Sequence, residues 1–72
     1  MVKLDSEKLF GLLVEQDRSI AWLARAVGLS YAYCWRLVYG KKTNPTLSTL
    51  NKLAKALNVD ARELIITEES HG

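Results

Sequence analysis

Cysteine, histidine and proline are each nearly absent from this 72-residue sequence, and so are long apolar runs. A single cysteine, Cys34, excludes a disulfide framework and an all-cysteine metal site. Because only one histidine, His71, accompanies it, we expect no metal site, no cofactor and no catalytic activity. No apolar run approaches the roughly 20 residues that a membrane span requires. The acidic N-terminal stretch is also atypical of a signal peptide, which favours a cytoplasmic protein with no membrane partner.

What remains is the composition of one small folded domain. Hydrophobic residues make up 49% of the chain and charged residues 25%, which is typical of a packed domain and not of a disordered segment. The length allows one domain with a thin core. We expect this domain to cover residues 1–66, and residues 67–72 to form a flexible tail because they lack apolar anchors.

The net charge of +2 is unevenly distributed along the chain. Residues 18–59 contain no acidic side chain and seven basic ones, namely Arg18, Arg25, Arg36, Lys41, Lys42, Lys52 and Lys55. Both flanking segments carry more acidic than basic residues. A basic middle between acidic ends indicates a surface that faces a polyanion.

Apolar residues recur at helical spacing along nearly the whole chain. Four such stretches follow residues suited to beginning a helix: Asp5 or Ser6, Ser19, Ser30 and Thr46. In the first stretch, Phe10 and Val14 are expected to widen the buried stripe. Asp60 and Glu63 have the spacing of a capping box and predict a fifth, short helix that reaches Leu64 to Ile66, where three apolar residues in succession also hint at a strand but are too few to decide. The sequence therefore predicts an all-α domain of five helices.

Two short helices joined by a tight turn stand at the centre of the chain, over residues 19–40. Ala24 is small where the two helices would cross, and Gly28 permits the positive φ angle of a sharp turn. Val27 and Leu29 would fill the wedge between the helices. Such a helix-turn-helix projects its second helix far enough to enter the major groove of DNA.

Two blocks of sequence extend this pattern. The first reads S-x-x-x-L-A-x-x-x-G-L-S from Ser19 and is followed by Gly40, and the second reads N-P-T-L-x-x-L-x-K-L-A-K-A-L-N-V from Asn44. Together they resemble the phage repressor and Cro type of helix-turn-helix domain, the XRE family, over residues 5–66. The resemblance implies a compact, lambda-repressor-like domain of five helices in a prokaryotic cell, phage or plasmid. It further implies a transcriptional regulator, most often a repressor, that binds a double-stranded DNA operator as a homodimer, with no effector domain evident.

The resemblance also assigns residues. It makes 31–39 the recognition helix and implies base contacts at Tyr31, Ala32 and Arg36, to which we add the aromatic residues Tyr33 and Trp35 as candidates. Trp35 could instead pack on the fourth helix, and Tyr39 could close the end of the third. The expected phosphate contacts are Ser19, Ser30, Tyr39, Lys41, Lys42, Thr43 and Asn44.

The chain also departs from the family pattern. Ile20 stands where the family often has a phosphate-binding glutamine. Leu13 and Val38 stand where it often has an arginine–glutamate pair, so we expect these two side chains to pack together. The aromatic outer face of the recognition helix leaves open a second function, a protein-binding module such as an antitoxin or anti-repressor.

The end of the predicted domain suggests a dimer interface. Three apolar residues in succession, Leu64, Ile65 and Ile66, cannot all face the core from one short helix. At least one of them is therefore expected to be exposed or to meet a partner. A homodimer formed there would hold two recognition helices roughly 34 Å apart, about one turn of DNA.

Overall fold

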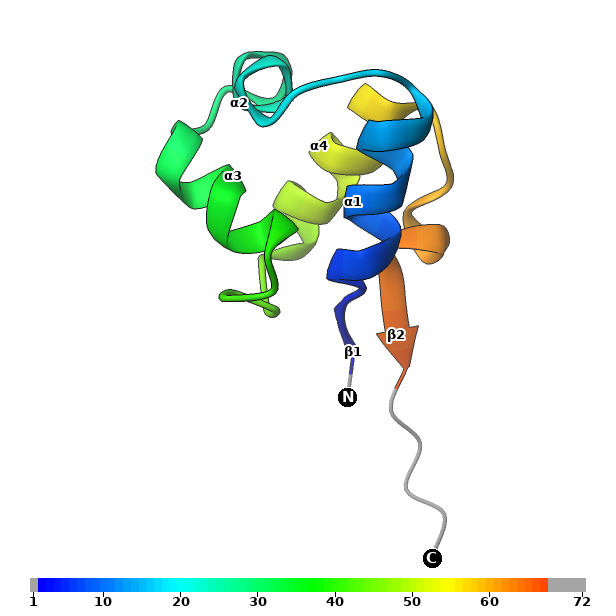
Figure 1. Cartoon of the computed structure of the whole chain (residues 1–72). Coiled ribbons are helices and arrows are strands. Elements are labelled where there is room, and N and C mark those ends of the chain that lie inside the picture. Colours follow the sequence, from blue (N-terminus) through cyan, green and yellow to red (C-terminus); the bar gives the residue numbers. More distant parts are fainter. Residues whose placement is uncertain (1, 68–72) are drawn as a thin grey trace, which may run out of the picture.

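The computed structural model describes residues 2–67, which form four α-helices, one 3-10 turn and two short strands (Figure 1). Strand β1 (Val2–Leu4) leads into α1 (Ser6–Glu15) and α2 (Ile20–Val27). The chain continues through α3 (Tyr31–Val38) and α4 (Leu47–Leu57). The described part ends with the 3-10 turn η1 (Ala61–Leu64) and strand β2 (Ile65–Thr67).

The predicted helix starts are confirmed by side-chain caps. The Asp5 carboxylate accepts a hydrogen bond of 3.1 Å from the Lys8 amide. Ser19, Ser30 and Thr46 each accept a bond of 3.0–3.2 Å from the amide three residues ahead. Each cap satisfies an amide that the first turn of a helix leaves unpaired. The helix-turn-helix is therefore bounded at the positions that its sequence predicts.

Four of the five predicted helices are present and the domain is mostly helical, but the prediction of a fifth helix is wrong, and two short strands pair at the ends of the described chain. The capping box of Asp60 and Glu63 is present, but it opens a single 3-10 turn, η1. The chain then becomes extended, and β2 pairs antiparallel with β1, with Lys3 opposite Ile66 and Leu4 opposite Ile65. β-Branched residues favour an extended chain when a partner strand is available. The partner comes from the other end of the chain, which local spacing does not reveal.

A leucine-rich core joins all of these elements. The residues without exposed surface include Leu9, Leu23, Leu37, Leu53, Leu57 and Leu64, so every helix and η1 contribute. Cys34 is equally buried and packs as a small apolar residue, and burial raises the pKa of its thiol. The buried side chains of α3 fix its orientation on the core. They therefore determine which of its other residues point outward.

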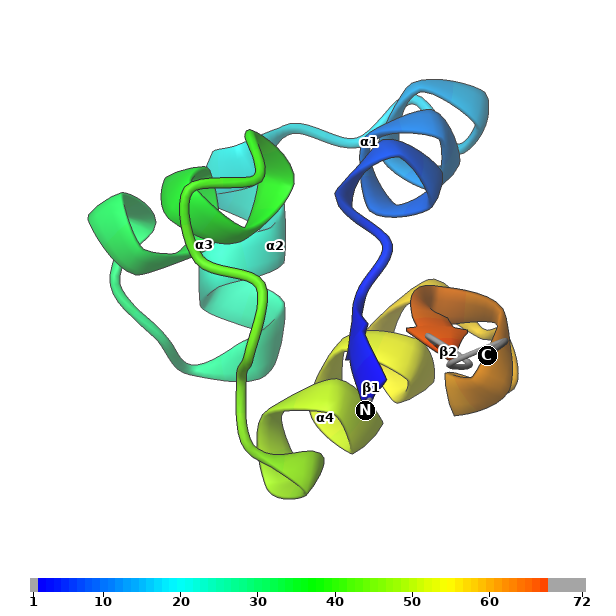
Figure 2. The ribbon, with the colours of Figure 1, turned by 90° about the horizontal axis from the view of Figure 1, so that it is seen from below.

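Two longer-range hydrogen bonds fix the edges of the domain. The Gln16 side-chain amide donates to the Leu57 carbonyl over 2.8 Å and ties the end of α1 to the end of α4. The Leu4 amide donates to the Thr43 carbonyl over 2.8 Å. Thr43 belongs to the loop that runs from the end of α3 to the start of α4 (Figure 2). The N-terminal strand therefore anchors the loop that follows α3.

None of the helices in the described part of the chain has the length and apolar character needed to cross a bilayer. Of the predicted tail, only Thr67 falls within the described residues, as the last residue of β2. His71 lies outside them.

Candidate nucleic-acid interface

The turn between α2 and α3 has the geometry that the sequence predicts. Gly28 adopts a left-handed conformation with φ of +72° and ends α2. Ala24 and Val27 are buried, and the Leu29 amide donates to the Ala24 carbonyl over 3.0 Å. A bulkier residue than Ala24 would separate two helices that pack at this crossing. The turn thus sets α3 at a fixed angle on the surface of the domain.

Helix α3 has one buried face and one open face. Cys34, Leu37 and Val38 are buried, and the residues on the open face are Tyr31, Ala32, Trp35, Arg36 and Tyr39. Four of the five predicted base-reading residues therefore share the exposed surface. The fifth, Tyr33, is half-buried against the core, and the Nζ of Lys42 lies 6.0 Å from the centre of its ring.

Arg36 is the charged group at the centre of the open face of α3. Its side chain is exposed and makes no hydrogen bond or ion pair with any residue between 2 and 67. A guanidinium offers several N–H donors in a planar fork, and an unpaired fork is suited to a bidentate partner. The side chain is therefore free for a ligand.

The loop after α3 places its two lysines differently. Lys41 is exposed and has no described partner, whereas the Nζ of Lys42 lies 3.5 Å from the Asn44 side-chain oxygen. The Lys41 amide donates to the Arg36 carbonyl over 2.8 Å, so the loop begins as a continuation of the helix end. Lys41 and Asn44 are the exposed residues of this loop. Thr43 is half-buried, and its carbonyl accepts a hydrogen bond from the Leu4 amide of β1.

The starts of α2 and α3 offer further donors. The Ser19 and Ser30 oxygens accept bonds from backbone amides, but neither hydroxyl donates a bond to a described residue. Both serines are exposed, so each hydroxyl proton is available to an anion. Thr46 at the start of α4 differs, because its hydroxyl donates to the Thr49 oxygen over 3.1 Å. The positive end of a helix dipole favours an anion at these positions.

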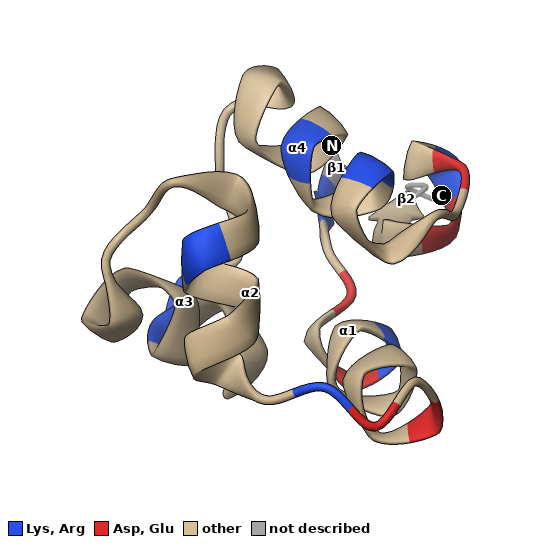
Figure 3. Cartoon of the chain, turned by 90° about the horizontal axis from the view of Figure 1, so that it is seen from above, with Lys and Arg blue, Asp and Glu red and all other residues tan. Residues whose placement is uncertain are grey.

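The distribution of charge separates this surface from the rest of the molecule (Figure 3). Helices α2, α3 and α4 carry basic side chains and no acidic ones, and the acidic residues of the described part of the chain lie on α1, at its ends and around η1. The basic residues nevertheless form two groups. Lys52 and Lys55 border a hollow between α2 and α4, while Arg36, Lys41 and Lys42 lie on α3 and the loop after it. The basic middle of the sequence is thus not one continuous surface.

Residues 8–70 match the family model of the Cro/C1-type helix-turn-helix DNA-binding domain. The chain belongs to this family. The predicted resemblance to repressor and Cro domains is thereby confirmed, although the fifth helix is replaced by η1 and β2. No curated protein matches the chain.

Solved structures share the same fold. The restriction-modification controller protein C.AhdI from Aeromonas hydrophila is 31% identical, covers 81% of this chain and 86% of its own, and has a TM-score of 0.75. A protein from Bacteroides fragilis is 35% identical over 92% of this chain and all of its own, with a TM-score of 0.76. The fold also matches that of SinR, crystallised in complex with DNA, at 23% identity, 79% and 90% coverage and a TM-score of 0.74.

The position where the Cro/C1-type family often has a phosphate-binding glutamine is apolar here. Ile20 is half-buried and packs against the core, so it supplies no side-chain donor. Leu13 and Val38, at the positions of the family's ion pair, are both buried in the core. Their direct contact stays a prediction.

A cluster of exposed aromatic rings lies beside the open face of α3. The ring centres of Trp35 and Tyr39 are 4.7 Å apart, and those of Tyr39 and Phe10 are 6.2 Å apart. The prediction that Phe10 and Val14 widen the buried stripe of α1 is wrong, because 46% of Phe10 and 63% of Val14 are exposed. Trp35 is 40% exposed, and its ring packs against that of Tyr39 at a tilt of 40°.

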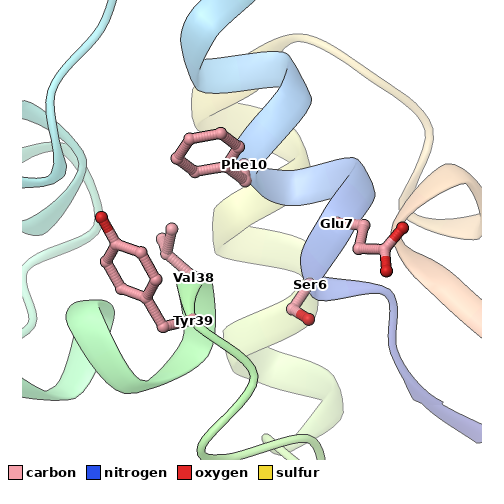
Figure 4. Close-up of a pocket in the computed structure, with 5 residues that line it drawn as sticks. All are labelled: Ser6, Glu7, Phe10, Val38 and Tyr39. Atoms are coloured by element: carbon pink, nitrogen blue, oxygen red, sulfur yellow. The ribbon is translucent and has the colours of Figure 1, made fainter.

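The aromatic cluster borders a pocket of about 520 Å³ between α1 and the end of α3. Figure 4 shows Phe10 and Tyr39 facing each other across the opening, with Val38 between them and the Glu7 carboxylate turned away. Gly40, which follows Tyr39, has a φ of +72°, and a Cβ added there would lie 3.0 Å from the Ser6 hydroxyl oxygen. The sequence does not predict this cluster, because helical spacing alone does not say how far a neighbouring helix covers a stripe.

A second apolar surface lies at the start of α4. Pro45, Leu47, Leu50, Ala61, Arg62 and Ile65 line a pocket of about 380 Å³. Leu47 is 72% exposed there, although it shares a helical stripe with the buried Leu50 and Leu53. Of the three residues predicted for a dimer interface, Ile65 is half-buried and Ile66 is 39% exposed, but Leu64 is fully buried and faces the core. Leu64 therefore does not reach a partner.

Groups suited to metal binding do not gather in the described part of the chain. Among residues 2–67, no three histidine, cysteine, aspartate or glutamate side chains lie close enough to hold an ion. The Arg62 guanidinium beside Asp60 lowers the pKa of that carboxyl to about 2, which leaves it ionised at neutral pH as a helix cap. This ion pair belongs to the structure of η1.

Proposed function

We propose that this protein is a transcriptional regulator that binds specific double-stranded DNA by inserting α3 into the major groove. The observation that carries the proposal is the unpaired Arg36 at the centre of the open face of α3, within an acid-free helix-turn-helix. Its membership in a DNA-binding family and the name of C.AhdI as a controller protein support the same function. Such a protein would work in the cytoplasm, beside the DNA.

Each exposed group has a distinct role in this proposal. Arg36 would bond the O6 and N7 atoms of a guanine, which is the commonest specific contact in the major groove. The Lys41 ammonium and the hydroxyls of Ser19 and Ser30 would bond phosphates on either side of the groove. Asn44, at the far end of the same loop, is placed to do the same. Phosphate contacts would set position and affinity, and Arg36 would set sequence preference.

A homodimer would use the apolar surface around Leu47. Leu47 is the most exposed of the large hydrophobic residues, and it borders an apolar pocket that Ile65 and Ala61 also line. Two copies related by a two-fold axis would bury this surface on each other, since the same patch meets itself in such an interface. The recognition helices would then face two half-sites roughly 34 Å apart.

The direct test of the function is selection of bound sequences from random duplex DNA, followed by a salt titration. We expect a repeated half-site, tighter binding to the selected duplex than to random duplex, and a fall of log K with log salt. A protein-binding module, favoured only by the exposed aromatic cluster of Phe10, Trp35 and Tyr39, would show no salt-dependent binding to duplex DNA. That result would contradict the proposed DNA-binding function and favour a protein-binding module.

The dimer is tested by the neutral variant Leu47→Gln. Because Leu47 is 72% exposed in one chain, we expect the fold to survive. Two leucine side chains would be lost from the apolar contact, so binding to a duplex with two half-sites should weaken at least about tenfold. Binding to a duplex with one half-site should stay unchanged. Gel-shift titrations measure the affinity for each of the two duplexes. Val14→Gln, at an exposed position on α1, is the matched control. Equal losses on both duplexes would contradict the dimer.

A further inference from the structure

The open face of α3 lacks the groups that read two of the four bases. Its exposed side chains are those of Tyr31, Ala32, Trp35, Arg36 and Tyr39, and none is an amide or a carboxylate. Asparagine and glutamine are the side chains that bond adenine bidentately, and aspartate and glutamate accept from the amino group of cytosine. The Arg36 guanidinium of α3 can therefore bind guanine bidentately, but the open face offers no amide for adenine and no carboxylate for cytosine.

The thymine methyl group is the feature of the major groove that an apolar surface reads. Trp35 and Arg36 come three and four residues after Ala32, so each of them is a neighbour of Ala32 on the surface of the helix. The small Ala32 side chain lets a base edge come close to α3, and the exposed part of the Trp35 ring forms an apolar wall beside it. A methyl group seated there would lie next to the group that reads guanine.

The Trp35 ring packs against a second aromatic ring. Its centre lies 4.7 Å from that of Tyr39, with the two ring planes tilted by 40°, and the centre of the Tyr39 ring lies 6.2 Å from that of Phe10 on α1. This row of three rings connects the open face of α3 to α1 and restricts the rotation of the tryptophan. A wall that is already ordered loses less conformational freedom when a ligand binds, which strengthens the contact.

We propose that Ala32 and Trp35 determine sequence specificity by binding the C5-methyl group of a thymine beside the guanine that Arg36 reads. The proposal rests on the proposed function, because it requires α3 to lie in the major groove. Each half-site then contains a thymine close to a guanine. The same position accepts the methyl group of 5-methylcytosine, which projects into the major groove from the same ring carbon.

The test uses the preferred duplex with single thymines replaced by deoxyuridine, a change that removes only the methyl group. We expect replacement at one position in each half-site to weaken binding about fourfold, the effect of one methyl group leaving an apolar contact. Replacement elsewhere in the duplex should change binding little. Cytosine at the sensitive position should weaken binding, and 5-methylcytosine at that position should restore part of it.

Variants of the two side chains complete the test. Ala32→Ser and Trp35→Gln should each bring the ratio of affinities for the thymine and deoxyuridine duplexes close to one. Ala26→Ser, at an exposed alanine of α2, should leave the ratio unchanged. Salt-dependent, specific binding with no sensitivity to any deoxyuridine would overturn the methyl site and leave the proposed function intact. A sensitivity that persists in both variants would overturn the assignment of Ala32 and Trp35. If the wild-type protein binds no duplex DNA at all, both the proposed function and this proposal are wrong.

Discussion

The substitution Val38→Glu is expected to lower the free energy of unfolding by about 3–5 kcal/mol, because it places an unpaired charge in the core. Val38 is only 3% exposed and Leu13 is equally buried, in a core whose described residues include no buried charged side chain. A carboxylate at position 38 would therefore lose its hydration without gaining a partner. Urea denaturation followed by circular dichroism measures the loss.

A second substitution tests whether the two positions meet. Adding Leu13→Arg should recover part of the lost stability, because it recreates the arginine–glutamate pair that the family often has at these positions. Val14→Glu is the matched control, since it makes the same change at a residue of α1 that is 63% exposed, and it should shift stability by less than about 0.5 kcal/mol. If Val38→Glu fails to fold alone, the helical signal of the double variant still reports the rescue. A double variant no more stable than the single one would show that Leu13 and Val38 do not face each other.

Features that depend on a few neighbouring residues were predictable from the sequence. Asp5, Ser19, Ser30 and Thr46 cap the four helices because a short polar side chain reaches the amide three residues ahead. The left-handed Gly28 follows in the same way from the need for a sharp turn. The buried stripe of α3 and the exposed position of Arg36 then follow from helical spacing alone.

Features that depend on distant parts of the chain were not predictable. The strand β2 forms because β1 lies beside it, and nothing near Ile65 indicates that partner. The bond from the Leu4 amide to the Thr43 carbonyl likewise joins residues far apart in sequence. Phe10 and Leu47 share helical stripes with buried leucines, yet 46% of Phe10 and 72% of Leu47 stay exposed because the neighbouring elements do not fully cover them. Helical spacing gives the direction of a side chain, whereas the packing of whole helices decides whether that direction is covered.

The substitutions Arg36→Ala and Lys41→Ala are expected to weaken DNA binding in different ways. Arg36 lies at the centre of the open face of α3, so its loss should cost about 1–3 kcal/mol on the preferred duplex and relax the preference at one base pair. Binding to random duplex should change less, because no base contact is lost there. Lys41 lies in the loop after α3 with its ammonium free, so its loss should weaken binding to both duplexes alike. It should also reduce the slope of log K against log salt by about 0.9, the effect of one phosphate contact.

Comparison with two other lysines distinguishes a local phosphate contact from a general loss of charge. Lys55→Ala removes the same charge, but Lys55 borders the hollow between α2 and α4, so the salt slope should stay unchanged. Lys42→Ala should have a smaller effect than Lys41→Ala, because the Lys42 ammonium is already placed near the Asn44 oxygen and the Tyr33 ring. Salt titrations of the four alanine variants on preferred and random duplexes measure these differences. If Lys55→Ala changes the slope as much as Lys41→Ala, binding depends on net charge and not on the loop after α3. If Arg36→Ala weakens both duplexes equally, Arg36 contacts a phosphate and the guanine contact assigned to α3 is wrong.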